Sequence, residues 1–216
     1  MLPDPQGSAA GTMKLLGGDP CLDFVNTVGG RVADAKARRA RVRDDKLGAY
    51  PDLVAFGLHV GLLARGPGRR LLRLGRAHPR AARAALEQAL ALREALYRAL
   101  HALMQGRPPF AADLEVLNTE LLRSRRHEVL AARGGGIRWE WRGPKGALQA
   151  PLWPVVRAAA TLMTSSELTH LRQCGGQGCG WLFLDRSRNR RRRWCSMDDC
   201  GNLDKVRRFR RRQARR

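Results

Sequence analysis

Near its C-terminus the chain carries the stretch Cys174-Gly-Gly-Gln-Gly-Cys179, followed fifteen residues later by Cys195-Ser-Met-Asp-Asp-Cys200. Four of the five cysteines lie in these two C-x4-C pairs. Two close pairs with a short insert are typical of a four-thiolate zinc site, because each pair can hold one side of a tetrahedral ion. Four thiolates leave no open coordination position. We therefore expect Cys174, Cys179, Cys195 and Cys200 to bind one structural Zn²⁺ ion.

The same cysteines could instead form two disulfides in a secreted domain. Residues 1–12 are rich in Pro, Gly and Ala and lack the basic and apolar regions of a signal peptide, so we expect a disordered tail there. Nor does an apolar run reach the roughly 18 residues of a membrane span. The sequence thus predicts a cytoplasmic protein without a membrane partner, and reduced thiols favour zinc over disulfides in that compartment.

Basic residues are concentrated beside the cysteines. The chain has 216 residues and a formal net charge of +22, and half of that charge falls in residues 171–216, where Lys and Arg number 15 and Asp and Glu 4. Such clustering is typical of a polyanion partner. The residues that we expect to contact nucleic acid are Arg190, Arg191, Arg192, Arg193, Asn202, Lys205, Arg207, Arg208, Arg211, Arg212 and Arg215.

The partner could be duplex DNA or RNA, and the Arg-rich end could also be a solubilising tail alone. Few aromatic residues are available to stack on single-stranded bases, which favours duplex DNA over RNA. A helix at 202–216 could enter a major groove, with basic residues on phosphates and Asn202 on base edges.

The finger is expected to be a treble-clef-like unit. Residues 181–185 alternate as a strand, 186–189 would form a turn, and 190–195 would return as the second strand. On the helix that follows, Leu203, Val206 and Phe209 are expected to pack on this hairpin.

The fold class predicted for the whole chain is α+β, with a mostly helical N-terminal domain and a small β-hairpin. Helices are expected at 52–63, 79–105, 111–124 and 151–163. Hairpin arms are expected at 127–131 and 137–141, around Gly134-Gly-Gly136. The longest helix could serve as a core helix or as a coiled-coil seam for a homodimer, and its short repeat favours the core. The domains would be 1–12 (tail), 13–168 and 169–216.

Several motifs resemble those of a known family. Trp181-Leu-Phe-Leu-Asp185-Arg-Ser187, Arg193-Trp-Cys-Ser-Met197 and Cys200-Gly-Asn202 are similar to the CGNR-type zinc finger. Residues 16–28, Leu-Gly-Gly-Asp-Pro-Cys-Leu-Asp-Phe-Val-Asn-Thr-Val, are similar to the start of the ABATE domain, which precedes that finger in the family. The resemblance implies a bacterial, nucleoid-associated, stress-induced transcription regulator. Leu203 stands where the family signature has Arg.

The remaining expectations concern the N-terminal domain. It would sense a small-molecule effector or pair subunits, and Asp23, Asn26 and Thr27 are the candidate ligand-pocket residues. A small-molecule-binding domain with the finger as a tether is therefore one alternative, and an RNA- or ribosome-associated protein is another. Cys21 is expected to be a buried small hydrophobe. Because the sequence carries no catalytic motif, we expect no enzymatic activity.

Overall fold

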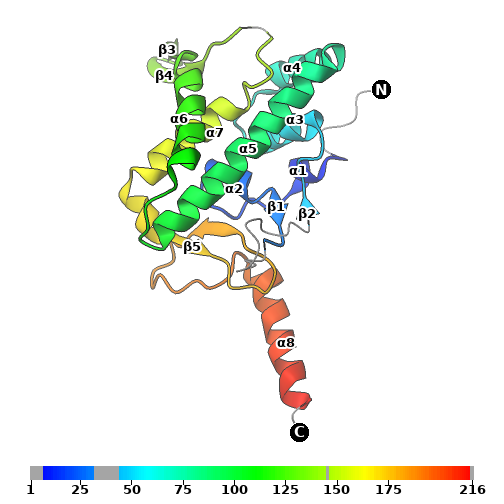
Figure 1. Cartoon of the computed structure of the whole chain (residues 1–216), viewed down its shortest axis with the longest axis vertical. Helices are drawn as coiled ribbons and strands as arrows, with labels where there is room; N and C mark the ends of the chain where they lie inside the picture. The colour runs from blue at the N-terminus through cyan, green and yellow to red at the C-terminus, as the bar shows by residue number, and fades with distance from the viewer. Residues whose placement is uncertain (1–6, 32–43, 145, 215–216) are drawn as a thin grey trace.

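The computed structural model describes residues 7–31, 44–144 and 146–214, which form a mostly helical body with a single helix projecting from it (Figure 1). The α-helices are α1 (Ala9–Thr12), α2 (Pro20–Val25), α3 (Tyr50–His59), α4 (Arg65–Ala77), α5 (Pro79–Met104), α6 (Ala111–Arg125), α7 (Leu152–Met163) and α8 (Asn202–Gln213). Single turns of other helix types lie at η2 (Ser166–His170) and η3 (Met197–Gly201).

The strands pair as small antiparallel sheets. They are β1 (Val28–Gly29) with β2 (Asp44–Asp45), β3 (Glu128–Arg133) with β4 (Gly136–Trp141), and β5 (Leu171–Gln173) with β6 (Leu182–Leu184). The predicted α+β class, with its small hairpin before the finger, is confirmed. In the β3–β4 hairpin Leu130 pairs with Trp139. The turn between them uses Gly134 and Gly135 at positive φ, where glycine carries no steric cost.

Helix α5 is the central element of the body. Its alanines and leucines recur at helical spacing, and the inward positions are fully buried. These positions include Ala85, Ala89, Leu92, Leu96 and Ala99. Helices α2, α3, α4, α6 and α7 contact α5. It is therefore a core helix, as its short apolar repeat predicted.

Helix α4 was not predicted, because the expected helices left residues 64–78 between them. The helix begins at Arg65, and Pro67 lies in its first turn, where the missing N–H is tolerated. Gly68 and Gly75 let α4 approach α3 closely. A Cβ on Gly75 would lie 2.8 Å from Cδ1 of Tyr50, so a larger residue would push the helices apart.

The predicted N-terminal tail is also partly wrong. Residues 1–6 lie outside the described part of the chain, but residues 9–12 form α1, whose first amides are capped by Ser8. Ala10 is fully buried, and the Ser8 hydroxyl donates a hydrogen bond of 2.7 Å to Asp52 on α3. This segment therefore contributes to the core.

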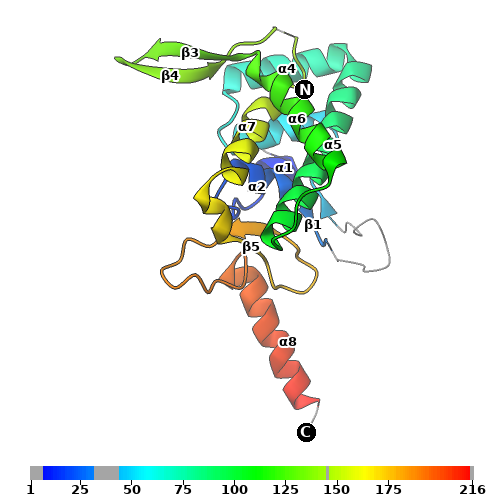
Figure 2. The same ribbon diagram turned by 60° about the vertical axis from the view of Figure 1, so that its left-hand side comes forward.

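The finger strands belong to the same hydrophobic core as the body. Leu171, Leu182 and Leu184 are at most 3% exposed and lie in one cluster with residues of α2, α3, α5 and α7. In both views β5 lies directly beneath the helical body, and α8 extends from there into solvent (Figures 1 and 2). No helix in the described residues is long and apolar enough to cross a membrane.

Candidate metal centre and nucleic-acid interface

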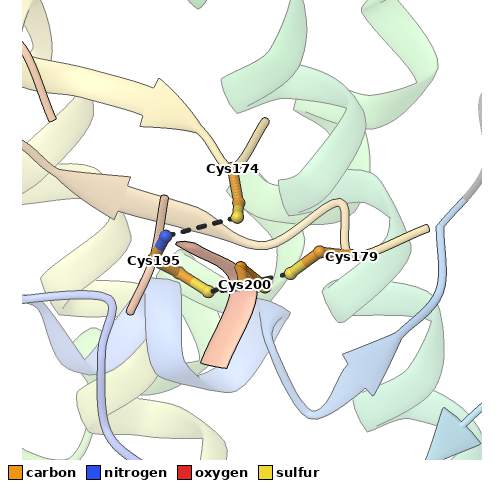
Figure 3. Close-up of side chains that lie close together, drawn as sticks. All are labelled: Cys174, Cys179, Cys195 and Cys200. Carbon is orange, nitrogen blue, oxygen red and sulfur yellow. Dashed lines mark hydrogen bonds between the residues drawn. The ribbon is translucent and has the colours of Figure 1, made fainter. Parts of the chain in front are cut away.

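The four cysteine sulfurs converge on one point below the β5–β6 pair (Figure 3). All four lie within 4.8 Å of one another. The Sγ atom of Cys195 is 3.7 Å from those of Cys179 and Cys200. A tetrahedral ion with Zn–S bonds of about 2.3 Å separates its sulfurs by about 3.8 Å, so this spacing fits one four-coordinate Zn²⁺. Cys174, Cys179, Cys195 and Cys200 are thus positioned to bind one metal ion, as predicted.

Backbone amides stabilise the thiolate form of Cys174. The Cys195 amide donates to its sulfur at 3.2 Å and the Gly176 amide at 3.4 Å. Hydrogen bonds from the thiols of Cys179 and Cys195 and from these amides hold the pKa of Cys174 well below its usual range. A metal ligand must be deprotonated, and the two backbone amides can stabilise such a thiolate at Cys174.

The hairpin of the finger is not the predicted one. Leu182–Leu184 pairs with β5, so the first two cysteines lie in the tight connection between β5 and β6. Residues 190–195 do not return as a strand. Asp185, fully buried, instead accepts hydrogen bonds from the amides of Ser187 and Arg192 and from the Ser187 hydroxyl. These bonds, which also lower the pKa of Asp185, fold the segment into a loop.

The N-terminal segment anchors the finger through Asn26 on α2. Its side-chain amide donates to the Leu182 carbonyl at 2.8 Å, and its oxygen accepts from the Leu182 amide at 2.9 Å. A single side chain thereby acts as a strand partner for β6. The Gly17 carbonyl accepts from the Leu184 amide at 2.9 Å, and the Val28 carbonyl accepts from the Trp181 indole at 3.1 Å.

A second set of contacts surrounds Cys179. Its carbonyl accepts a hydrogen bond of 3.1 Å from the Gly30 amide. Gly180 has a φ of +73°, and a Cβ there would lie 2.7 Å from the Arg31 carbonyl, so only glycine fits. Arg31 is buried, forms an ion pair with Glu94 on α5, and lies over the ring of Tyr97. The metal centre is therefore attached to the longest helix.

Ligand binding by Asp23, Asn26 and Thr27 stays a prediction, and in the structure these residues hold the N-terminal segment. All three side chains are at most 6% exposed, and each bonds within the protein. Asp23 accepts from the Gly17 amide at 2.8 Å. The Thr27 hydroxyl donates to the Phe24 carbonyl and accepts from Arg93. These residues join the N-terminal segment to the core.

Burial also raises the pKa of two titratable groups in this region. It raises the pKa of Asp23 to about 6. It likewise raises the pKa of the fully buried Cys21 thiol well above its usual value, as expected for a cysteine that acts as a small hydrophobe.

Most of the predicted nucleic-acid-binding residues lie on two exposed segments, which we call the basic loop (186–193) and α8. Arg190, Arg191 and Arg193 on the loop are exposed, as are Asn202, Lys205, Arg208, Arg211 and Arg212 on α8. Arg207 is half-buried and donates a 3.4 Å hydrogen bond to the Gln177 carbonyl. Arg215 lies outside the described residues. Sequence reasoning missed Arg188 and Arg210, which are exposed in the same segments and were signalled by the same charge clustering.

Arg192 is held by the finger itself. Its guanidinium lies 4.5 Å from the ring centroid of Phe183 and donates to the carbonyls of Trp194 and Cys195. Its charge is therefore committed to packing the loop, unlike that of Arg191.

Helix α8 has no buried residue, and most of its side chains are exposed. Leu203, Val206 and Phe209 are 55%, 46% and 63% exposed, so the predicted packing of these residues on a hairpin is wrong. The segment that should have formed the second strand is a loop, and no residue of α8 belongs to the cluster around Phe183 among the described residues. Its first turn follows η3, where the Ser196 side chain accepts from the Asp199 amide and Cys200 supplies a sulfur. Lys14 forms an ion pair of 2.7 Å with Asp199, which links η3 to the N-terminal segment.

Comparison with known protein families gives two matches. Residues 18–166 match the family described as "ABATE: Putative stress-induced transcription regulator". Residues 170–213 match the CGNR zinc finger. No curated protein matches the chain.

Proposed function

We propose that this chain, which belongs to the ABATE family and carries a CGNR zinc finger, is a transcription regulator that binds duplex DNA through α8 and the basic loop. The observation that carries this proposal is α8, a basic helix that projects into solvent from the metal centre (Figure 2). A helix that stabilised only the fold would bury one face.

The dimensions of α8 suit the major groove of B-DNA. Its 12 residues span about 18 Å at 1.5 Å per residue, and the groove is about 12 Å wide and admits one helix. The helix carries six basic side chains, namely Lys205, Arg207, Arg208, Arg210, Arg211 and Arg212. Each phosphate that they neutralise releases counterions and adds affinity that depends on salt.

Zinc would position this helix. Cys195 lies just before η3 and Cys200 lies within it, and η3 leads directly into α8. The opposite pair lies in the connection between β5 and β6. When bound, the ion supplies a rigid tetrahedral junction between the body and the root of the helix. Without it, the direction of α8 relative to the basic loop would depend on η3 alone.

Duplex DNA is favoured over duplex RNA because of groove shape. The major groove of A-form RNA is deep and narrow, so side chains on a helix as wide as α8 cannot reach its bases. An RNA- or ribosome-associated role therefore predicts weaker contacts from α8 than from the basic loop.

The test is equilibrium binding of the zinc-loaded full-length protein to a 20-base-pair mixed-sequence DNA duplex and to an RNA duplex of the same sequence, at matched salt. We expect tighter binding to DNA, loss of affinity after zinc chelation, and recovery when zinc is restored. Equal or tighter binding to RNA would contradict the DNA assignment. DNA binding that survives complete zinc removal would contradict the positioning role of the metal.

A further inference from the structure

The exposed surface of α8 divides into an uncharged face between two basic rows. Asn202, Val206, Phe209 and Gln213 recur at i, i+4, i+7 and i+11, which places them on one face at 100° per residue. All four are exposed, and Phe209 is 63% exposed. We call this the amide–apolar face.

The basic residues lie on both flanks of that face. The same angular spacing places Lys205, Arg208 and Arg212 on one side and Arg207 and Arg210 on the other, while Arg211 lies on the opposite surface of the helix. Arg208 is partly engaged with Asp204 at 3.1 Å. Solubility alone does not require that uncharged and basic side chains lie on separate faces. Exposed Val and Phe side chains between two cationic rows indicate a contact surface.

We infer that the amide–apolar face reads A·T base pairs in the major groove, while the two basic rows contact the phosphates on either side. This inference rests on the proposed DNA-binding function. Asparagine and glutamine amides can pair with N6 and N7 of adenine, and apolar side chains contact the C5-methyl group of thymine. The face therefore presents the groups that complement the two bases of an A·T pair.

The local geometry leaves Asn202 able to make such a pair. One of its two amide hydrogens is donated to the Asp198 carbonyl at 3.2 Å. The side-chain oxygen and the second hydrogen remain to accept from N6 and donate to N7 of adenine. From Asn202 to Gln213 the face is about 16 Å long, so several consecutive base pairs lie within its reach.

The test uses three libraries of 20-base-pair duplexes with identical flanks and six randomised central base pairs. The centres contain only A and T, only G and C, or only A and U. Uracil lacks the thymine methyl but keeps every other group at both groove edges, so the A·U library isolates the methyl contact. We expect the zinc-loaded full-length protein to bind the A·T library at least about fivefold more tightly than the G·C library. This is the smallest factor by which one bidentate amide–adenine contact discriminates against the wrong base. It should bind the A·U library about fourfold more weakly than the A·T library, as expected for one lost methyl contact.

Variants assign the effect to the face. Gln213→Ala and Phe209→Ala should reduce the A·T preference at least about fivefold and fourfold, respectively, and leave the salt slope unchanged. Arg208→Ala/Arg212→Ala should weaken binding to all three libraries equally. Leu122→Ala removes an apolar side chain of 66% exposure on α6, remote from α8, and serves as the matched control with no effect.

The outcomes are separable. If the wild-type protein binds none of the duplexes, the proposed function itself fails. Equal binding to the A·T and G·C libraries, or an A·T preference that the face variants leave intact, would overturn the inference while the proposed function stands. Equal binding to the A·T and A·U libraries would overturn the methyl contact.

Discussion

Replacing Asn26 by alanine should destabilise the whole protein and not the finger alone. The side chain is 1% exposed and satisfies both the amide and the carbonyl of Leu182 on β6. The variant leaves two buried backbone groups without a partner. Each such group costs about 1–3 kcal/mol, so the free energy of unfolding should fall by about 2–6 kcal/mol. That is a large fraction of the roughly 5–15 kcal/mol of a typical domain.

The assay is urea unfolding followed in the same sample by tryptophan fluorescence and by zinc release to a chromophoric chelator. With a slope of about 2–3 kcal/mol per molar urea, the midpoint should fall by about 1–3 M. Because Leu171, Leu182 and Leu184 share the core of the body, the two signals should move together. Asn202→Ala removes an exposed amide and is the matched control, expected to change stability by less than about 0.5 kcal/mol.

Two results would refute this reasoning. A loss below about 0.5 kcal/mol for Asn26→Ala would mean that the two hydrogen bonds do not hold β6. Zinc release at much lower urea than the fluorescence change would mean that the finger unfolds independently of the body.

Cys200→Ser should lower the zinc content below one ion per chain, since it removes one of four ligands; undiminished zinc by elemental analysis would contradict the four-thiolate site. Asp23→Asn should remove a pH dependence of stability. Burial raises the folded pKa of Asp23 from 3.8 to about 6, so the stability of the wild-type protein should fall as the pH rises from about 4 to 6. Thermal melts of both proteins across that range test this, and identical pH profiles would contradict it. Arg191→Ala should flatten the salt dependence of DNA binding by about 0.9, whereas Arg192→Ala should lower thermal stability and leave the slope unchanged, because its guanidinium packs on Phe183; the same slope change in both variants would contradict this distinction.

The metal centre could be predicted from the sequence because its information is local. Two C-x4-C pairs specify a tetrahedral site whatever lies between them, and the sulfurs of Cys174 and Cys200 converge as expected. The periodicity of α5 is likewise a property of consecutive residues, so its position and its buried face were predictable.

The attachment of the finger was not predictable, because its contacts are remote in sequence. Asn26 and Leu182 are separated by 156 positions, and a polar residue in an apolar segment equally suggests a ligand pocket. The predicted packing of α8 was wrong for a related reason. Residues 190–195 have a strand-like pattern, but the buried carboxylate of Asp185 folds them into a loop, which leaves Leu203, Val206 and Phe209 without a surface to cover.

The central claim, that this family member binds specific duplex DNA, is tested most directly by selection from fragmented genomic DNA of the source organism. The zinc-loaded full-length protein would be used at about physiological salt, with total RNA of that organism as competitor. We predict a small set of strongly enriched fragments that share A·T-containing sites and lie in promoters. Uniform, salt-sensitive retention of all fragments, or preferential binding to the RNA, would contradict a sequence-specific regulator.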